Sequence, residues 1–262
     1  MILLPTTISF TKKPKLHNDV AFTGLPGIGL VGKIALDHLM KQLGAEKIAT
    51  IYSDSFPPSV HTKDALLELI KDDVHVFNFK GRDFVFLTGP VQPTLDFGKG
   101  SVAEHYEFAT AIVNAFKELG VSEVYTLAGI NVGLKRMKSE PRVVIAATSK
   151  KVLDDWQSSG VVSDRTEGLV SGAAGLVLGL AKEHGMQGAC LMGETNAQLL
   201  YGDPGAAKKI VELLVKRYGF KIDMSGIEKD AKGIEEAFSK LSEQIQEGED
   251  AEPDNQHLTY VR

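Results

Sequence analysis

Glycines in the segment 24–33 form the first pattern that could do chemistry. Gly27, Gly29 and Gly32 have the spacing of a dinucleotide-binding turn, and they lie between a predicted strand and a predicted helix. Glycines are needed in such a turn because the backbone must approach a pyrophosphate closely. The turn also needs an acid near the end of the following strand to bind the ribose. Asp54 is the available acid, and it lies slightly farther from the glycine turn in the sequence than this type of site usually requires.

The same segment matches a phosphate-binding loop in part. The spacing from Gly27 to Lys33 fits, but Ile34 stands where that loop requires Ser or Thr to hold magnesium. A simpler interpretation is that the glycines let the strand turn sharply and let the helix pack close to the sheet. A nucleotide- or nucleoside-binding site is therefore kept only as an alternative hypothesis.

A second glycine-containing turn, Ala128–Gly133, follows another predicted strand. Glycine turns after successive strands would line one rim of the sheet, where α/β folds often bind ligands. Asn131 could contact a ligand on that rim, or it could form a turn by hydrogen bonding to the backbone. The residues of this candidate ligand rim are Gly24, Gly27, Gly29, Gly32, Lys33 and Asn131.

Other reactive side chains form no pattern typical of catalysis. The sequence has no G-x-S-x-G motif, and its seven histidines are not paired at metal-ligand spacing. Glu104 and His105 could form an acid–base pair, but a solvated helix face explains them more simply. Cys190 is the only cysteine and lies in an apolar run, which predicts a buried, inert thiol. We therefore expect no catalytic residue, no metal and no cofactor.

The elements that would position these residues alternate between strands and helices. Period-2 patterns predict strands at 19–23, 47–52, 74–79, 84–87, 123–128, 142–148 and 188–192. Helical spacing predicts helices at 30–43, 101–119, 172–181 and 204–218. This alternation predicts a three-layer α/β domain over residues 1–222, with helices covering a mostly parallel sheet. The hairpin near residue 80 makes the sheet mixed.

Residues 223–246 predict an amphipathic helix for oligomerisation. Their apolar side chains repeat every seven residues, in the columns of a coiled-coil seam about three heptads long. These residues are Ile227, Ala231, Ile234, Phe238, Leu241 and Ile245. The alternative is a helix packed against its own domain. The polar residues around the seam favour a homo-oligomer, which we expect to be a tetramer, although such a seam also fits two or three strands.

Residues 247–262 form an acidic tail whose composition predicts a solvated linker. The tail ends in the apolar and aromatic cluster His257–Arg262, which solubility does not explain. This cluster is typical of a short docking peptide. The expected partner-binding residues are Leu258, Tyr260, Val261 and Arg262.

Five segments together resemble the proteasome assembly chaperone family, and its archaeal members most closely. They are Gly24–Gly32, Ser55–Pro58, Gly89–Pro93, Ala128–Asn131 and Ser171–Leu176. The resemblance covers roughly residues 15–220. It implies a fold like that of nucleoside phosphorylases, without their catalytic residues. It also implies binding to the α-subunit ring of the 20S proteasome through a C-terminal hydrophobic–Tyr–X motif. The family pattern has Tyr in the penultimate place, whereas this sequence has Val261 there.

Composition is compatible with this assignment and disfavours other classes. The chain has 262 residues, 43% of them hydrophobic, which is enough for one sizeable core. A net charge of −5 without basic runs disfavours nucleic acid as a partner. No apolar stretch approaches the roughly 20 residues that span a bilayer, and the N-terminal sequence does not resemble a signal peptide. We therefore expect a cytoplasmic, non-enzymatic protein that binds proteasome α subunits.

Overall fold

The computed structural model describes residues 6–16, 19–93, 102–164, 167–199 and 201–234. Its strands are β1 (Thr6–Phe10), β2 (Val20–Gly24), β3 (Glu46–Ser53), β4 (Val60–Lys63), β5 (Leu66–Leu69), β6 (Asp72–Phe79), β7 (Arg82–Thr88), β8 (Glu123–Asn131), β9 (Val143–Ala147) and β10 (Gln187–Thr195). Its helices are η1 (Ile28–Leu30), α1 (Val31–Leu43), α2 (Val102–Leu119), α3 (Lys135–Lys138), α4 (Lys150–Gln157), α5 (Gly172–Glu183) and α6 (Pro204–Tyr218).

One mixed sheet forms the centre of the molecule, in the order β1-β3-β6-β7-β2-β8-β10-β9. The neighbouring strands β7, β2, β8 and β10 run parallel, with Phe22 opposite both Phe86 and Tyr125. The outer pairs β1–β3, β3–β6, β6–β7 and β9–β10 are antiparallel. The prediction of a mixed sheet is confirmed. The expectation that it is mostly parallel is wrong, because short turns such as Lys80–Gly81 can only join antiparallel neighbours.

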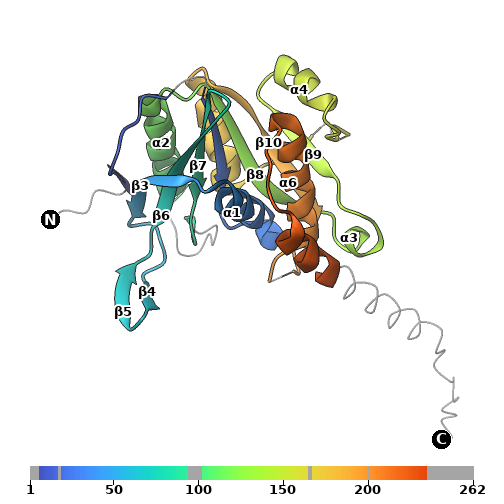
Figure 1. Ribbon diagram of the computed structural model, residues 1–262, viewed down its shortest axis with the longest axis horizontal. Helices are drawn as coiled ribbons and strands as arrows, with labels where there is room; N and C mark the ends of the chain where they lie inside the picture. The colour runs from blue at the N-terminus through green and yellow to red at the C-terminus, as the bar shows by residue number, and fades with distance from the viewer. Residues whose placement is uncertain (1–5, 17–18, 94–101, 165–166, 200, 235–262) are drawn as a thin grey trace, which may run out of the picture.

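Helices cover both faces of this sheet (Figure 1). On one face α1 and α6 pack over the aromatic residues Phe22, Phe84 and Tyr125, and Trp156 of α4 joins the same core. On the other face α2 and α5 pack together over the opposite sides of the same strands. The strands are therefore buried on both faces, as parallel central strands usually are.

The chain becomes helical again over residues 225–234. Ile227 is only 2% exposed and belongs to the core under α1 and α6, while Ala231 is 6% exposed. The first two seam positions are thus buried within the chain's own domain, as in the alternative considered for this helix. Ile234 is half-buried, and Phe238, Leu241 and Ile245 lie outside the described residues. An oligomerising helix over 223–246 stays a prediction.

Within the residues that the structure describes, no helix combines the length and the apolar character needed to cross a membrane.

Candidate functional site

The carboxyl ends of the parallel strands meet at one edge of the sheet, called here the carboxyl edge. The turn after β2, the end of β8 and the start of α5 surround an apolar pocket of about 170 Å³ at this edge. Its lining includes Leu25, Ile28, Leu127, Ile130, Leu169, Val170, Ala174 and Met192. This set, called the apolar pocket below, offers mainly aliphatic surface to whatever enters it.

Gln92, a polar side chain that lines the pocket, uses both ends of its amide for hydrogen bonds within the protein. Its amide nitrogen donates a hydrogen bond to the Pro26 carbonyl, and its amide oxygen accepts one from the Ala173 N–H at 2.9 Å. These bonds tie the segment after β7 to the turn after β2 and to α5. Gln92 therefore holds the pocket together and is not free to activate a substrate.

Two glycines of the candidate ligand rim allow close packing of α1 on the sheet. A Cβ at Gly32 would lie 2.0 Å from the carbonyl oxygen of Leu127 in β8. A Cβ at Gly24 would lie 2.5 Å from the carbonyl oxygen of Gly32 and 2.6 Å from the Cβ of Leu36. These contacts support the interpretation that the glycines serve packing.

The space beside Gly29, where a pyrophosphate would approach in a dinucleotide turn, is filled by protein. Gly29 has a φ of 60°, and a Cβ there would lie 2.5 Å from Oγ1 of Thr195. Asp54, the acid considered for the ribose, follows β3. Two strands, β6 and β7, separate β3 from β2, so the two strands are about 14 Å apart. The topology therefore differs from a dinucleotide-binding unit, in which the two strands are neighbours.

Two of the three remaining rim residues, Lys33 and Asn131, also have partners within the fold. The Lys33 ammonium pairs with the Asp37 carboxylate at 2.6 Å. The side-chain oxygen of Asn131 accepts hydrogen bonds from the N–H groups of Gly133 and Ala197, at 3.0 and 3.1 Å. Gly27 is exposed, with an extended backbone and no neighbour near its Cβ position. The structure brings all six rim residues to the carboxyl edge but gives most of them structural contacts.

A buried ion pair lies beside this rim and was not predicted. The guanidinium of Arg136 makes two hydrogen bonds to the carboxylate of Asp203, at 2.7 and 2.9 Å, and both side chains have no exposed surface. Asp203 also accepts hydrogen bonds from Thr195 Oγ1 and from the N–H of Ala206, in the first turn of α6. In the sequence Arg136 lies between Lys135 and Lys138, and such a charged segment is more typical of a solvated surface.

Asp72, at the start of β6, is another buried acid at the carboxyl edge. Burial raises its pKa from the ordinary 3.8 to about 8, and the Val91 N–H and the Lys33 ammonium oppose this shift only in part. Among the described residues, no group donates a hydrogen bond of good geometry to either carboxylate oxygen. Asp72 packs directly against Gly89, where a Cβ would lie 1.7 Å from Oδ1.

Cys190 is buried in β10, and burial raises its pKa to about 11, which makes it unreactive as a nucleophile. No group of three or more metal-ligating side chains occurs within the ranges that the structure describes. The expected docking residues Leu258, Tyr260, Val261 and Arg262 lie outside those ranges.

Comparisons with known proteins find similarity over most of the chain. The model of the PAC2 family matches residues 21–242. An uncharacterized protein of Methanocaldococcus jannaschii is 32% identical over 251 residues, which covers 94% of this chain and 93% of that protein.

Two solved structures from Pyrococcus furiosus are also similar. PbaB, described as an archaeal proteasome activator, shares 32% identity with a TM-score of 0.81, over 90% of this chain and 98% of its own. PbaA, described as an archaeal homolog of proteasome-assembly chaperone, shares 26% identity with a TM-score of 0.71, over 94% and 95% of the two chains.

Proposed function

Because the chain belongs to the PAC2 family, we propose that it is a non-catalytic assembly chaperone or activator of the proteasome. Family membership confirms the resemblance indicated by the glycine-rich segment and the four other motifs. The observation that carries the functional proposal is the similarity to the proteasome activator PbaB over nearly the whole chain.

A non-catalytic role agrees with the geometry of the carboxyl edge. Gly24, Gly29 and Gly32 are explained by packing, and the Gln92 amide is used within the fold. The buried Arg136–Asp203 pair anchors α3 to the start of α6. This edge is therefore built as a rigid scaffold with an apolar surface, which suits protein binding better than the activation of a small substrate.

The partner in this proposal is the α-subunit ring of the 20S proteasome, and the contact is made by the last residues of the sequence. Tyr260 and Val261 would bury apolar surface between α subunits, each contributing at most about 1.5–3 kcal/mol. Leu258 and Arg262 flank them. Val261 stands where the family pattern has Tyr, so the apolar contacts in this proposal extend over Leu258, Tyr260 and Val261.

One such peptide binds weakly, so the proposal includes a homo-oligomer that presents several tails together. Linked copies raise the strength of binding by roughly 10² to 10⁴ when the linkers can span the sites. The acidic segment between residues 247 and 254 has the composition of a flexible linker. A tetramer is the expected form.

A binding experiment with purified components tests this function. Immobilised 20S proteasome α subunits should retain the full chain and should lose it when residues 260–262 are deleted. Thr259→Ala, a polar change beside the apolar positions, is the matched control and should bind normally. Equal retention of the deletion variant and the full chain would refute docking through the tail. Failure of the full chain to bind at all would refute the choice of partner.

A further inference from the structure

Asp72 lies where the hairpin of β4 and β5 returns to the central sheet, below β6 in Figure 1. Its side chain has no exposed surface, yet neither of its carboxylate oxygens has a hydrogen-bond partner among the described residues. The preceding residue, Lys71, pairs with Glu68 of β5 at 3.3 Å and not with Asp72. The carboxyl group is therefore both buried and unpaired.

The segment 89–92, which follows β7, covers this carboxyl group. A Cβ at Gly89 would lie 1.7 Å from Oδ1 of Asp72 and 2.2 Å from its Cγ, so only glycine fits there. The next residue, Pro90, is exposed, so the segment has solvent on its outer side. One layer of backbone thus separates the Asp72 carboxyl group from water.

The surroundings of Asp72 favour its neutral form. Burial raises its pKa, while the Val91 N–H and the Lys33 ammonium of α1 lower it in part, and the neighbouring Asp73 carboxylate of β6 raises it. The segment 89–92 itself carries no charge. An ionised carboxylate without donors is costly to bury, so the closed arrangement holds the protonated acid.

The same segment forms part of the wall of the apolar pocket. Gln92 lines the pocket and binds the Pro26 carbonyl and the Ala173 N–H. Val91 packs against the core under α2 and α5. If the segment moved away from Asp72, both side chains would leave these places and the pocket would widen.

Ionised Asp72 needs water or a donor, and the segment 89–92 is the neighbour that can move most easily. On its other sides Asp72 is held by the sheet, in which it pairs with Ile51 of β3 and Asp73 pairs with Thr88 of β7. The segment belongs to no strand or helix. We propose that it is a gate of the apolar pocket, which lies closed over the neutral Asp72 carboxyl group and opens when that group ionises.

The direction of the pH effect follows from the two states. In the closed state Asp72 ionises only near pH 8, whereas in the open, hydrated state its ordinary pKa of 3.8 applies. Between these values each unit of pH shifts the equilibrium up to tenfold toward the open state. The gate is therefore most firmly closed at about pH 4 and opens progressively as the pH rises to about 8.

Hydrogen exchange at two backbone amides tests this gate. The Val91 N–H faces Asp72 and the Ala173 N–H donates to Gln92, so both should exchange when the segment opens. After correction for the intrinsic rate, their protection should fall by up to tenfold per pH unit between pH 5 and 8. Asp72→Asn, which cannot ionise, should show no such fall, and the exposed control Asp54→Asn should behave as the wild type does.

A second variant keeps the acid and weakens the gate. Gln92→Ala should lower the protection of Val91 at every pH while the slope persists, because Asp72 is still present. A wild-type chain whose protection does not depend on pH would overturn the proposal, as would an equal slope in the Asp72→Asn chain.

An apolar dye reports on the pocket itself. The wild-type chain should bind 8-anilinonaphthalene-1-sulfonate more tightly at pH 8 than at pH 5, and Asp72→Asn should bind it equally at both. Leu169, which is 97% exposed and lines the pocket, gives the control for position. Leu169→Ser should weaken dye binding at pH 8, and circular dichroism would verify that each variant is folded. A pH-dependent increase that Leu169→Ser leaves unchanged would place the opening elsewhere and overturn the proposal. These measurements need no proteasome, so they are independent of the proposed function.

Discussion

Arg136 and Asp203 show how single residues give the carboxyl edge its rigidity. Removing two charges from water is costly, and their attraction compensates only when the geometry is good. Here two side-by-side hydrogen bonds of 2.7 and 2.9 Å join the planar guanidinium to the carboxylate, and Thr195 and the Ala206 N–H donate to the same carboxylate. The pair therefore fixes α3, β10 and α6 relative to each other, beside the apolar pocket.

Asp72 lacks such a partner, and this predicts a pH-dependent stability. Its folded-state pKa of about 8 lies above the ordinary 3.8, so the folded protein holds a proton that the unfolded chain releases. The free energy of unfolding should therefore fall as pH rises from about 4 to 8, by at most about 1.4 kcal/mol per pH unit from this group. Asp72→Asn should remove this slope and be more stable than the wild type at pH 7.

Urea unfolding at several pH values between 4 and 8 measures this effect. Asp54→Asn is the matched control, because Asp54 is exposed and its substitution should leave the wild-type slope in place. If the Asp72→Asn chain shows the same pH dependence as the wild type, the carboxylate is not protonated in the folded protein.

At the scale of elements, the position of α1 depends on Gly32. Alanine there would place a Cβ 2.0 Å from the Leu127 carbonyl oxygen, which is part of the β8 backbone and cannot move aside cheaply. We expect Gly32→Ala to lower the free energy of unfolding by about 1–3 kcal/mol, the usual cost of overpacking. Gly27→Ala should cause no loss, because nothing lies within 4 Å of that Cβ position. Comparable losses in the two variants would show that packing does not explain these glycines.

The elements predicted from periodicity match the structure closely where the pattern is long. The helix expected at 101–119 is α2 at Val102–Leu119, and the helix expected at 204–218 is α6 at Pro204–Tyr218. Strand order was harder to predict, because β2 and β3 are consecutive in sequence but two strands lie between them. The later strands β6 and β7 insert between β2 and β3 only when the sheet forms. Local sequence patterns do not indicate this insertion.

In the candidate site too, neighbouring residues indicated the local structure, but contacts between residues distant in sequence could not be predicted. The glycine spacing correctly indicated a tight turn from β2 into α1, but its purpose depends on Leu127 and Thr195, far away in the chain. The pair Arg136–Asp203 joins residues 67 positions apart, so neither residue alone signals its partner. The hairpin of β4 and β5 was not predicted, although Val60 and Thr62, and Leu67 and Leu69, alternate with other residues around a short turn.

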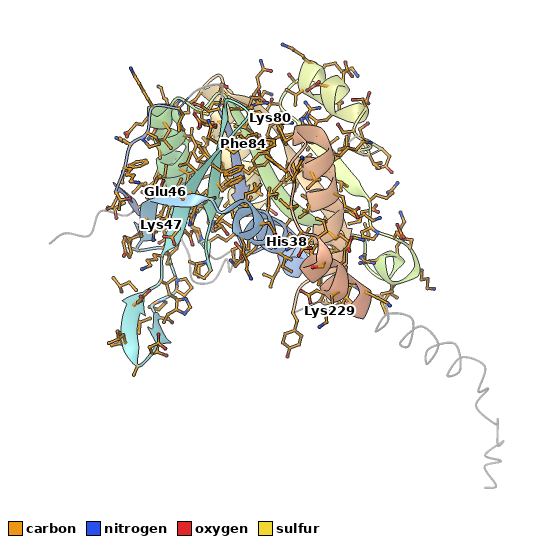
Figure 2. All side chains as sticks on the ribbon, in the orientation of Figure 1. His38, Glu46, Lys47, Lys80, Phe84 and Lys229 are labelled. Carbon is orange, nitrogen blue, oxygen red and sulfur yellow. The ribbon has the colours of Figure 1, made fainter. Side chains whose placement is uncertain are left out.

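At the scale of the whole molecule, the proposed function makes the tails of several copies act together. Lys229, labelled in Figure 2, places the last described helix at the end of the molecule opposite Lys80. In a closed cyclic oligomer, every copy has the same orientation relative to the symmetry axis. In such a form of the proposed homo-oligomer, all tails would start from one face and could reach one α ring together.

This proposal predicts that binding to the proteasome depends on residues outside the docking peptide. Phe238→Glu, in the predicted seam of residues 223–246, should keep the tail but lose the oligomer, so its affinity for the α ring should fall by roughly 10² to 10⁴, toward that of a single tail. Ser239→Glu, at a polar position of the same segment, should bind as the wild type does, and deletion of residues 260–262 should abolish binding while the oligomer persists. Surface plasmon resonance on immobilised 20S proteasome separates these cases. Full affinity in a monomeric Phe238→Glu chain would mean that one tail is sufficient.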